Sequence, residues 1–318
     1  MDDGSLPVPL EDGAQAPSLS PAPAPRRRSS PWLHAGLLLA TIFSTTIVGA
    51  VLAGDDPFSF ALLEKIVRHP GEWPAGLPYS LSALFILGCH EMGHYVACRL
   101  YRIDASLPYF LPGANMFGTF GAVIRIRAHF PTRRALFDVG VAGPIAGFVA
   151  ILPVLALGFA WSTPTNVPPV PGEVGLPSCL LLSLLSPLFF DPAQGASIHL
   201  HPLFVAAWFG LFATSLNLLP IGQLDGGHML YALSPRAHAI VSRFGSLLLV
   251  AFGLLSGGAH LVVFGVLFWL IGLRHPRPLD AIEPLGAGRH AVALFGLLLL
   301  VLTFFPMAPQ VFGVFLFP

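Results

Sequence analysis

Long apolar stretches separated by short polar segments dominate the chain. They lie at about residues 32–53, 78–101, 136–161, 203–219, 238–255, 258–273 and 290–305. A helix of about 20 mostly apolar residues is long enough to cross the hydrocarbon core of a bilayer. The pattern therefore predicts an all-α polytopic membrane protein with about 6–7 transmembrane helices.

Two shorter apolar runs do not fit this simple pattern. Residues 176–190 contain two prolines and number only about 15, which favours an interfacial or re-entrant helix over a full span. For residues 304–318 the sequence does not distinguish between a segment that spans the membrane, re-enters it or lies on its surface.

The polar segment between the second and third stretches, residues 104–134, carries a different pattern. Ile124, Arg125, Ile126 and Arg127 alternate with the period of two that is typical of a β-strand, and several glycines precede them. We expect a small membrane-associated β-hairpin here. A free sheet edge can bind an extended peptide, whereas a loop that only packs against the helices is the alternative.

Composition agrees with a membrane protein and excludes other classes. Hydrophobic residues make up 54% of the chain and charged residues 10%, with a mean hydropathy of +0.75, whereas about a quarter of residues are charged in soluble proteins. The net charge of zero gives no indication of a nucleic-acid partner. Cys89, Cys98 and Cys179 are too few for a disulfide scaffold.

The ends of the apolar stretches predict an orientation. Residues 1–31 are rich in Pro, Ser and Ala and are expected to form a disordered tail before a membrane domain at 32–318. The first apolar stretch favours a retained anchor over a cleaved signal peptide. With a cytoplasmic amino terminus and seven spans, all 16 Lys and Arg except Lys65 and Arg68 lie on the cytoplasmic side. We expect a bacterial cytoplasmic (inner) membrane.

The second apolar stretch contains the chemically most informative residues. His90, Glu91 and His94 form a His-Glu-x-x-His pattern, and in a helix the two histidines lie one turn apart on one face. Two imidazoles can then share a zinc ion, with Glu91 placed as general base for a bound water. Two histidines of an ordinary surface helix are the alternative, but ionisable residues in a membrane-length segment are costly. Cys89 is a further possible ligand, although a buried packing role is favoured.

A catalytic zinc site usually has three protein ligands, so a third ligand is expected elsewhere. Asp225 is the candidate, because Pro220, Gly222 and Gly226 interrupt its apolar segment and a broken helix can bring a carboxylate to a buried site. His228 competes as a ligand, but a position next to the ligands is favoured. A simple turn role is the alternative for Asp225.

The chain resembles the site-2 protease family of intramembrane zinc metalloproteases over about residues 78–235. Three motifs carry the resemblance: His90-Glu91-x-x-His94, the glycine-rich segment 140–147, and Asn217-x-x-Pro220 followed by Leu224-Asp225-Gly226. The resemblance implies that His90, His94 and Asp225 bind zinc and that Glu91 activates water. It also implies that Asn217 contacts the substrate backbone or the oxyanion, and that the hairpin presents the substrate as a strand. The spacing leaves no room for a PDZ domain, as in compact members, and residues 238–318 are expected to add further transmembrane helices.

These inferences predict a protease that hydrolyses peptide bonds within or next to transmembrane segments of membrane proteins. Its expected partners are the lipid bilayer and transmembrane protein substrates, while its oligomeric state stays open. One alternative is an ion or metal transporter that uses the same His, Glu and Asp cluster. The other is a catalytically silent homologue that binds client proteins.

Overall fold

Helices make up most of the protein. The computed structural model describes residues 30–53, 64, 67–165, 176–190, 197–256, 258–272, 279–280 and 284–304. Almost all of the tail predicted at residues 1–31 lies outside these ranges, and so does all but the first residue of the ambiguous segment 304–318.

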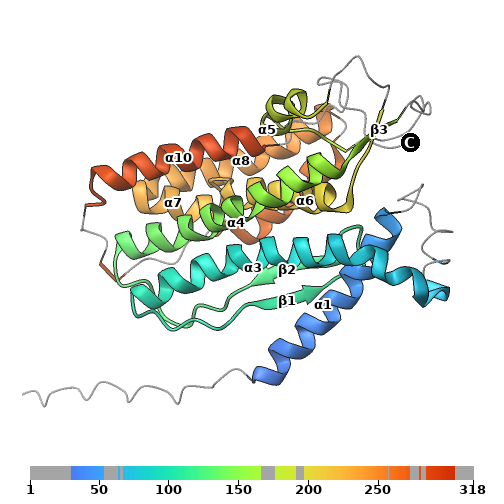
Figure 1. Cartoon of the computed structure of the whole chain (residues 1–318). Coiled ribbons are helices and arrows are strands. Elements are labelled where there is room, and N and C mark those ends of the chain that lie inside the picture. The colour runs from blue at the N-terminus through green and yellow to red at the C-terminus, as the bar shows by residue number, and fades with distance from the viewer. Residues whose placement is uncertain are drawn as a thin grey trace, which may run out of the picture.

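Three helices that carry the predicted motifs lie against one another (Figure 1). They are α3 (Leu77–Leu100), α4 (Arg133–Trp161) and α6 (Pro202–Leu218). Within the described ranges the other helices are α1 (Pro31–Leu52), α5 (Leu180–Leu185), α7 (Asp225–Leu233), α8 (Pro235–Ser256), α9 (Ala259–Gly272) and α10 (Ala287–Thr303), with 3-10 turns at Pro70–Gly76 and Ser186–Leu188. The strands are β1 (Tyr109–Pro112), β2 (Thr119–Val123), β3 (Thr163–Thr165) and β4 (Ser197–His199).

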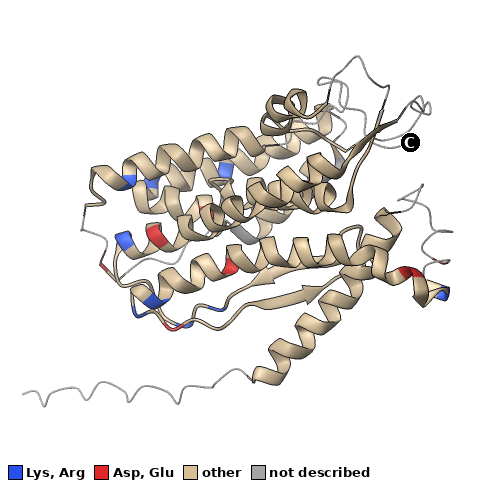
Figure 2. Ribbon diagram, in the orientation of Figure 1, with Lys and Arg blue, Asp and Glu red and all other residues tan. Residues whose placement is uncertain are grey.

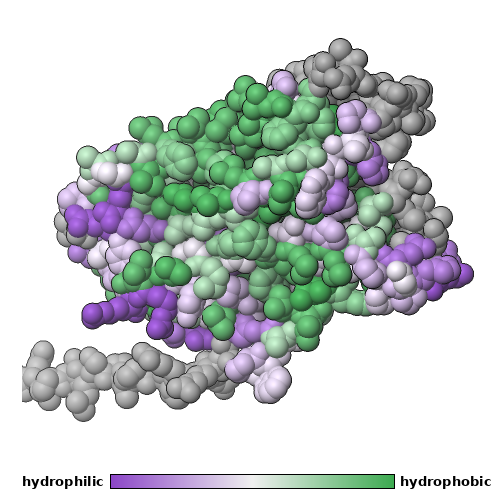
Figure 3. Space-filling model, in the orientation of Figure 1, coloured by the Kyte–Doolittle hydropathy of each residue, from purple (hydrophilic) through white to green (hydrophobic). Residues whose placement is uncertain are grey.

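Each of the seven predicted apolar stretches coincides with a helix. Of the described helices, α1, α4 and α8 are long and apolar enough to cross a membrane, while α6, residues Leu261–Leu270 of α9, and α10 are shorter apolar helices. With 24 residues, α3 is also long enough to cross a membrane, but its polar motif lowers its mean hydropathy. On the face seen in Figure 3, apolar residues cover much of the middle, and hydrophilic ones gather towards the two ends. The apolar helices indicate membrane association, whereas the number of spans stays a prediction.

The predicted hairpin is present between α3 and α4. β1 and β2 pair antiparallel, with Tyr109 opposite Val123, so the regular strands precede the alternating residues 124–127. Those residues continue the pairing irregularly through a single bridge between Ala105 and Ile126. In Figure 1 the hairpin runs along α3, with β2 between α3 and β1.

Side-chain hydrogen bonds from two helices hold the tip of the hairpin. The Ser44 hydroxyl of α1 donates to the Gly118 carbonyl at 2.6 Å, and the Tyr79 hydroxyl of α3 donates to the Phe117 carbonyl at 3.0 Å. Both donors come from helices that pack on each other. The hairpin is thus fixed in position relative to the motif on α3.

A second antiparallel pair, β3 with β4, was not predicted, so the protein is mostly helical rather than strictly all-α. Each strand has only three residues, too few for an alternating pattern to stand out. Within the predicted interfacial segment, α5 has six residues. Its length of about 9 Å is too short to span a bilayer.

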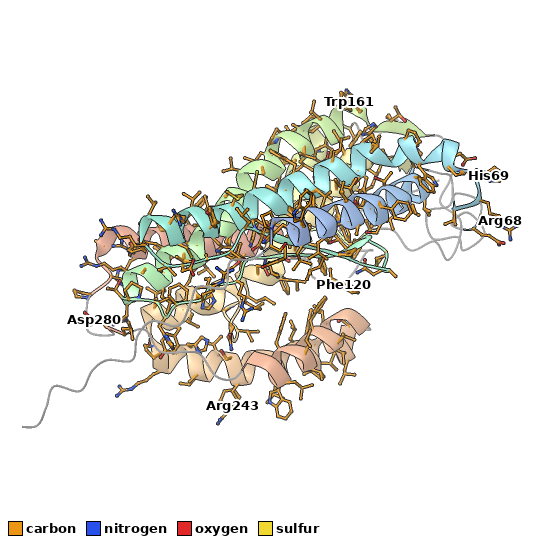
Figure 4. The ribbon with its side chains drawn as sticks, turned by 90° about the horizontal axis from the view of Figure 1, so that it is seen from below. Arg68, His69, Phe120, Trp161, Arg243 and Asp280 are labelled. Atoms are coloured by element: carbon orange, nitrogen blue, oxygen red, sulfur yellow. The ribbon has the colours of Figure 1, made fainter. Side chains whose placement is uncertain are left out.

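Charged side chains mark the end of the molecule where α3 ends and α4 begins (Figure 2). There Arg289 of α10 donates to both carboxylate oxygens of Asp138 on α4, at 2.8 and 2.6 Å, and the Tyr101 hydroxyl donates to the same carboxylate at 2.5 Å. Figure 4 places Asp280 towards this end and Arg68 at the opposite one. The ion pair joins the last described helix to the helices that carry the motifs.

Candidate metal centre

The His-Glu-x-x-His residues lie on the buried face of α3. Nitrogen or oxygen atoms of His90, Glu91 and His94 lie within 4.8 Å of one another, and all three residues are buried. The Nε2 atoms of the two histidines are 3.1 Å apart. The one-turn spacing thus brings both imidazoles to one point, as predicted.

Asp225, the first residue of α7, lies at the same point. Its Oδ2 is 3.2 Å from Nε2 of His90, and its Oδ1 is 3.3 Å from Nε2 of His94. In a tetrahedral zinc site with bonds of about 2.0–2.1 Å, neighbouring donor atoms lie about 3.3–3.4 Å apart. The two nitrogens and the carboxylate therefore fit a zinc ion in donor type and in spacing.

The backbone of α4 orients one of the imidazoles. Nδ1 of His94 lies 2.7 Å from the carbonyl oxygen of Val139. Since a carbonyl accepts only, Nδ1 carries the proton. In the neutral imidazole this leaves the Nε2 lone pair free to face Asp225 and a metal.

Glycines on α4 leave space for both imidazoles. A Cβ atom at Gly143 would collide with the ring of His94, and one at Gly147 would lie 3.1 Å from Nδ1 of His90. These glycines belong to the segment 140–147 that the sequence singled out, but only the structure assigns them this role. They allow α4 to pack closely on α3 without displacing the histidines.

The turn between α6 and α7 depends on glycine as well. Gly222 has a φ of 58°, in the left-handed region that side chains other than glycine seldom adopt. A Cβ at Gly226 would collide with the carbonyl oxygen of Leu218, and one at Gly227 with that of Gly222. The chain therefore reverses tightly after α6 and begins α7 beside the histidines, which confirms the interrupted helix.

Glu91 joins the centre to the hairpin. Its Oε2 accepts a hydrogen bond of 2.9 Å from the backbone N–H of Ile124, just after β2. A cavity of about 270 Å³ opens between these elements and is bounded by the three motif residues, Asp225 and residues 122–124 of the hairpin. Glu91 therefore faces a cavity that also borders the hairpin.

The other predicted residues fall into two groups. Asn217 and His228 line the same cavity, and Nδ2 of Asn217 is 3.3 Å from Nε2 of His90. Cys89 is instead a half-buried free thiol that packs against the apolar core. Gln223 and Phe130 also line the cavity and were not predicted. One sequence feature could have indicated Gln223: it is a polar residue among the apolar residues before Asp225.

Comparison with known proteins agrees with this geometry. A sequence model for peptidase family M50 matches residues 79–256. The chain belongs to peptidase family M50. This confirms the resemblance drawn from the three motifs.

Plant proteins are among the relatives of this M50 member. "Probable zinc metalloprotease EGY1, chloroplastic" of Arabidopsis thaliana is 34% identical over 251 residues, which are 73% of this chain and 43% of the relative. "Probable zinc metalloprotease EGY2, chloroplastic" of Oryza sativa subsp. indica is 32% identical over 244 residues, 74% of this chain and 44% of the relative. "Probable zinc metallopeptidase EGY3, chloroplastic" of Arabidopsis thaliana is 27% identical over 318 residues, 90% of this chain and 51% of the relative.

The chain thus spans about half or less of the length of these relatives. The names of these relatives place them in chloroplasts. They give no support to the expected bacterial membrane, although the apolar helices agree with a membrane location.

Proposed function

We propose that this M50 member is an intramembrane zinc metalloprotease that hydrolyses peptide bonds within or next to transmembrane segments of membrane proteins. One observation carries the proposal: donor atoms of His90, His94 and Asp225 lie 3.1–3.3 Å apart, with Glu91 beside them. The apolar helices of the protein and the relatives named as probable zinc metalloproteases support the same conclusion.

His90, His94 and Asp225 would hold the ion. Zinc, when bound, supplies Lewis-acid activation of a water molecule and of the scissile carbonyl. Glu91 takes the proton of the attacking water and passes it to the departing amine. Oε2 of Glu91 accepts the Ile124 N–H, so Oε1 is the oxygen assigned to receive this proton.

The free edge of β2 is the proposed binding site for the substrate backbone. Within the described residues, β2 pairs on one side only, with β1, and residues 122–124 border the cavity. An extended peptide that adds to this edge is held by main-chain hydrogen bonds. A substrate helix must therefore unwind locally, since its backbone groups are otherwise paired within the helix.

Two polar residues of the cavity wall complete the proposed site. The side-chain amide of Asn217 donates to the oxyanion or to the substrate backbone, in keeping with its position 3.3 Å from Nε2 of His90. His228 lies next to the ligands in the cavity wall rather than on the metal, because His90, His94 and Asp225 already supply three protein ligands.

For the membrane arrangement we propose about 6–7 spans, with the metalloprotease core at residues 78–235 and additional helices at 238–318. The arginine-rich end of α3 and α4 faces the cytoplasm in this arrangement (Figure 2). Water then enters the cavity from that side.

A Glu91→Gln variant tests the activity. Full-length wild type and variant are purified in detergent and incubated with a panel of single-span membrane peptides, while bound zinc is measured by elemental analysis. We expect the variant to keep its zinc and to lose about 100- to 10,000-fold in cleavage rate, the usual contribution of a general base.

The matched control is Glu64→Gln, which makes the same change at an exposed residue paired with Arg68. It should cleave at the wild-type rate. Wild-type cleavage by Glu91→Gln would contradict the mechanism. Ion flux through vesicles that contain the wild type, without cleavage of any peptide, would favour a transporter.

A further inference from the structure

Helix α8 contacts the turn that precedes Asp225 through polar side chains. Nε2 of His238 lies 2.8 Å from the carbonyl oxygen of Gly222, and the hydroxyl oxygen of Ser242 accepts a 2.9 Å hydrogen bond from the N–H of Gly222. Both backbone groups of this glycine are therefore paired with α8. A third contact of 3.2 Å joins Ser242 Oγ and His238 Nε2.

The hydrogen bonds fix the state of the imidazole. The Gly222 carbonyl only accepts, so Nε2 of His238 carries a proton and donates. His238 and Ser242 are 2% and 1% exposed, so water does not replace either bond. Figure 4 shows Arg243 on the outer side of the same helix, away from the other helices.

Gly222 in turn contacts the start of α7. A Cβ at Gly227 would collide with the Gly222 carbonyl, so the two backbones are in close contact. Asp225 lies two residues before Gly227, in the same first turn of α7. A shift of Gly222 would thus move the Asp225 carboxylate away from His90 and His94.

We propose that His238 and Ser242 are positioning residues that hold the Gly222 turn so that Asp225 reaches the metal together with the two histidines. This inference rests on the proposed function, because it gives Asp225 the role of a ligand. Neither residue lines the cavity that contains His90, His94 and Asp225. His238 and Ser242 keep the turn at Gly222 in place, so that the Asp225 carboxylate stays in the correct position.

Zinc affinity and coordination geometry test this proposal in the full-length protein in detergent. Zinc is titrated against a competing chelator, and Co²⁺ is substituted so that its visible d–d absorption reports the geometry. Residues that orient metal ligands typically contribute about 10- to 100-fold in affinity. We expect Ser242→Ala and His238→Phe each to weaken zinc by about 10-fold or more and to reduce the tetrahedral Co²⁺ bands.

Ser246→Ala is the matched control. Its hydroxyl is fully buried on the same helix, one turn further on, but donates to the Ser242 carbonyl within α8. It should lower stability to a similar extent as Ser242→Ala and leave zinc affinity and the Co²⁺ spectrum unchanged. Ser242→Thr and His238→Gln retain a hydroxyl or an N–H donor and should recover most of the affinity.

The outcomes separate this inference from the proposed function. Wild-type zinc binding in Ser242→Ala and His238→Phe, or equal losses in Ser246→Ala, would overturn the positioning role alone. A wild type without zinc affinity would overturn both, whereas Asp225→Ala with wild-type affinity would remove the ligand role of Asp225 and with it the positioning role. If His238→Phe fails to fold, Ser242→Ala and its threonine counterpart decide the question.

Discussion

The two halves of the metal centre are built in different ways. On α3 the histidines and Glu91 lie within one turn of a continuous helix, so helical geometry alone brings them together. Asp225 instead follows a tight reversal between α6 and α7 that needs a left-handed glycine at 222 and close backbone contacts at 226 and 227. The first half is thus local, and the second depends on packing between separate elements.

This difference determines which substitutions away from the ligands should affect zinc binding. In the α3 half, the helix sets the spacing of the two imidazoles, and α4 only orients the His94 ring and leaves room for it. In the α7 half, the ligand moves whenever the turn or its contacts with α8 change. Residues that never touch the metal should therefore matter mainly in the second half.

The largest expected effects come from the ligands themselves. His94→Ala and Asp225→Ala should each weaken zinc by more than the roughly 100-fold typical of residues next to ligands, since each removes a donor. Chelator competition measures both variants. Asp104→Ala, which removes a partly exposed carboxylate paired with Arg127, should leave zinc affinity unchanged. Equal affinity in Asp225→Ala and wild type would mean that α3 alone makes the site.

Glycine substitutions test the packing around each half. A Cβ at Gly143 would press on His94, and one at Gly226 on the Leu218 carbonyl. Overpacking of this kind costs about 1–3 kcal/mol. We expect Gly143→Ala and Gly226→Ala to lower the free energy of unfolding by that amount and also to weaken zinc.

Gly36→Ala is the control for these glycines, because nothing lies within 4 Å of a Cβ there. In a helix interior, alanine is favoured over glycine by about 0.5–1 kcal/mol, so this variant should unfold no more easily than wild type. The readout is denaturant unfolding of the zinc-free protein in detergent. A destabilised Gly36→Ala alongside stable Gly143→Ala and Gly226→Ala would contradict the packing argument.

The sequence was sufficient for the local half of the centre. The spacing of His90 and His94 within an apolar segment predicts their shared face, and helix geometry leaves little freedom. Asp225 was also predicted, from a chemical need for a third ligand and from the glycines and proline around it. The structure confirms its proximity to the histidines, at 3.2 and 3.3 Å.

The parts that escaped prediction depend on contacts between distant segments. Residues 124–127 alternate like a strand, yet the regular pairing lies at 109–112 and 119–123, and the tip between these strands is held by hydrogen bonds from α1 and α3. His238 and Ser242 look like ordinary polar residues of an apolar helix. Their hydrogen-bond partner is the backbone of Gly222, 16 and 20 residues earlier, and sequence spacing carries no information on such a contact.

Breaking the ion pair between Arg289 and Asp138 should have the smallest effect. It tests whether contacts outside both halves of the metal centre affect zinc binding. It joins α10 to α4 through two hydrogen bonds of 2.8 and 2.6 Å, but 28% and 29% of these side chains remain exposed. Partly exposed pairs contribute about 0.2–1 kcal/mol. In a double-mutant cycle of Arg289→Ala and Asp138→Asn, the coupling free energy should fall in that range, with zinc affinity equal to wild type. A tenfold loss of zinc affinity in Arg289→Ala would show that α10, through its pair with α4, also affects the ligand geometry, so that the orientation of His94 by α4 depends on packing beyond the centre.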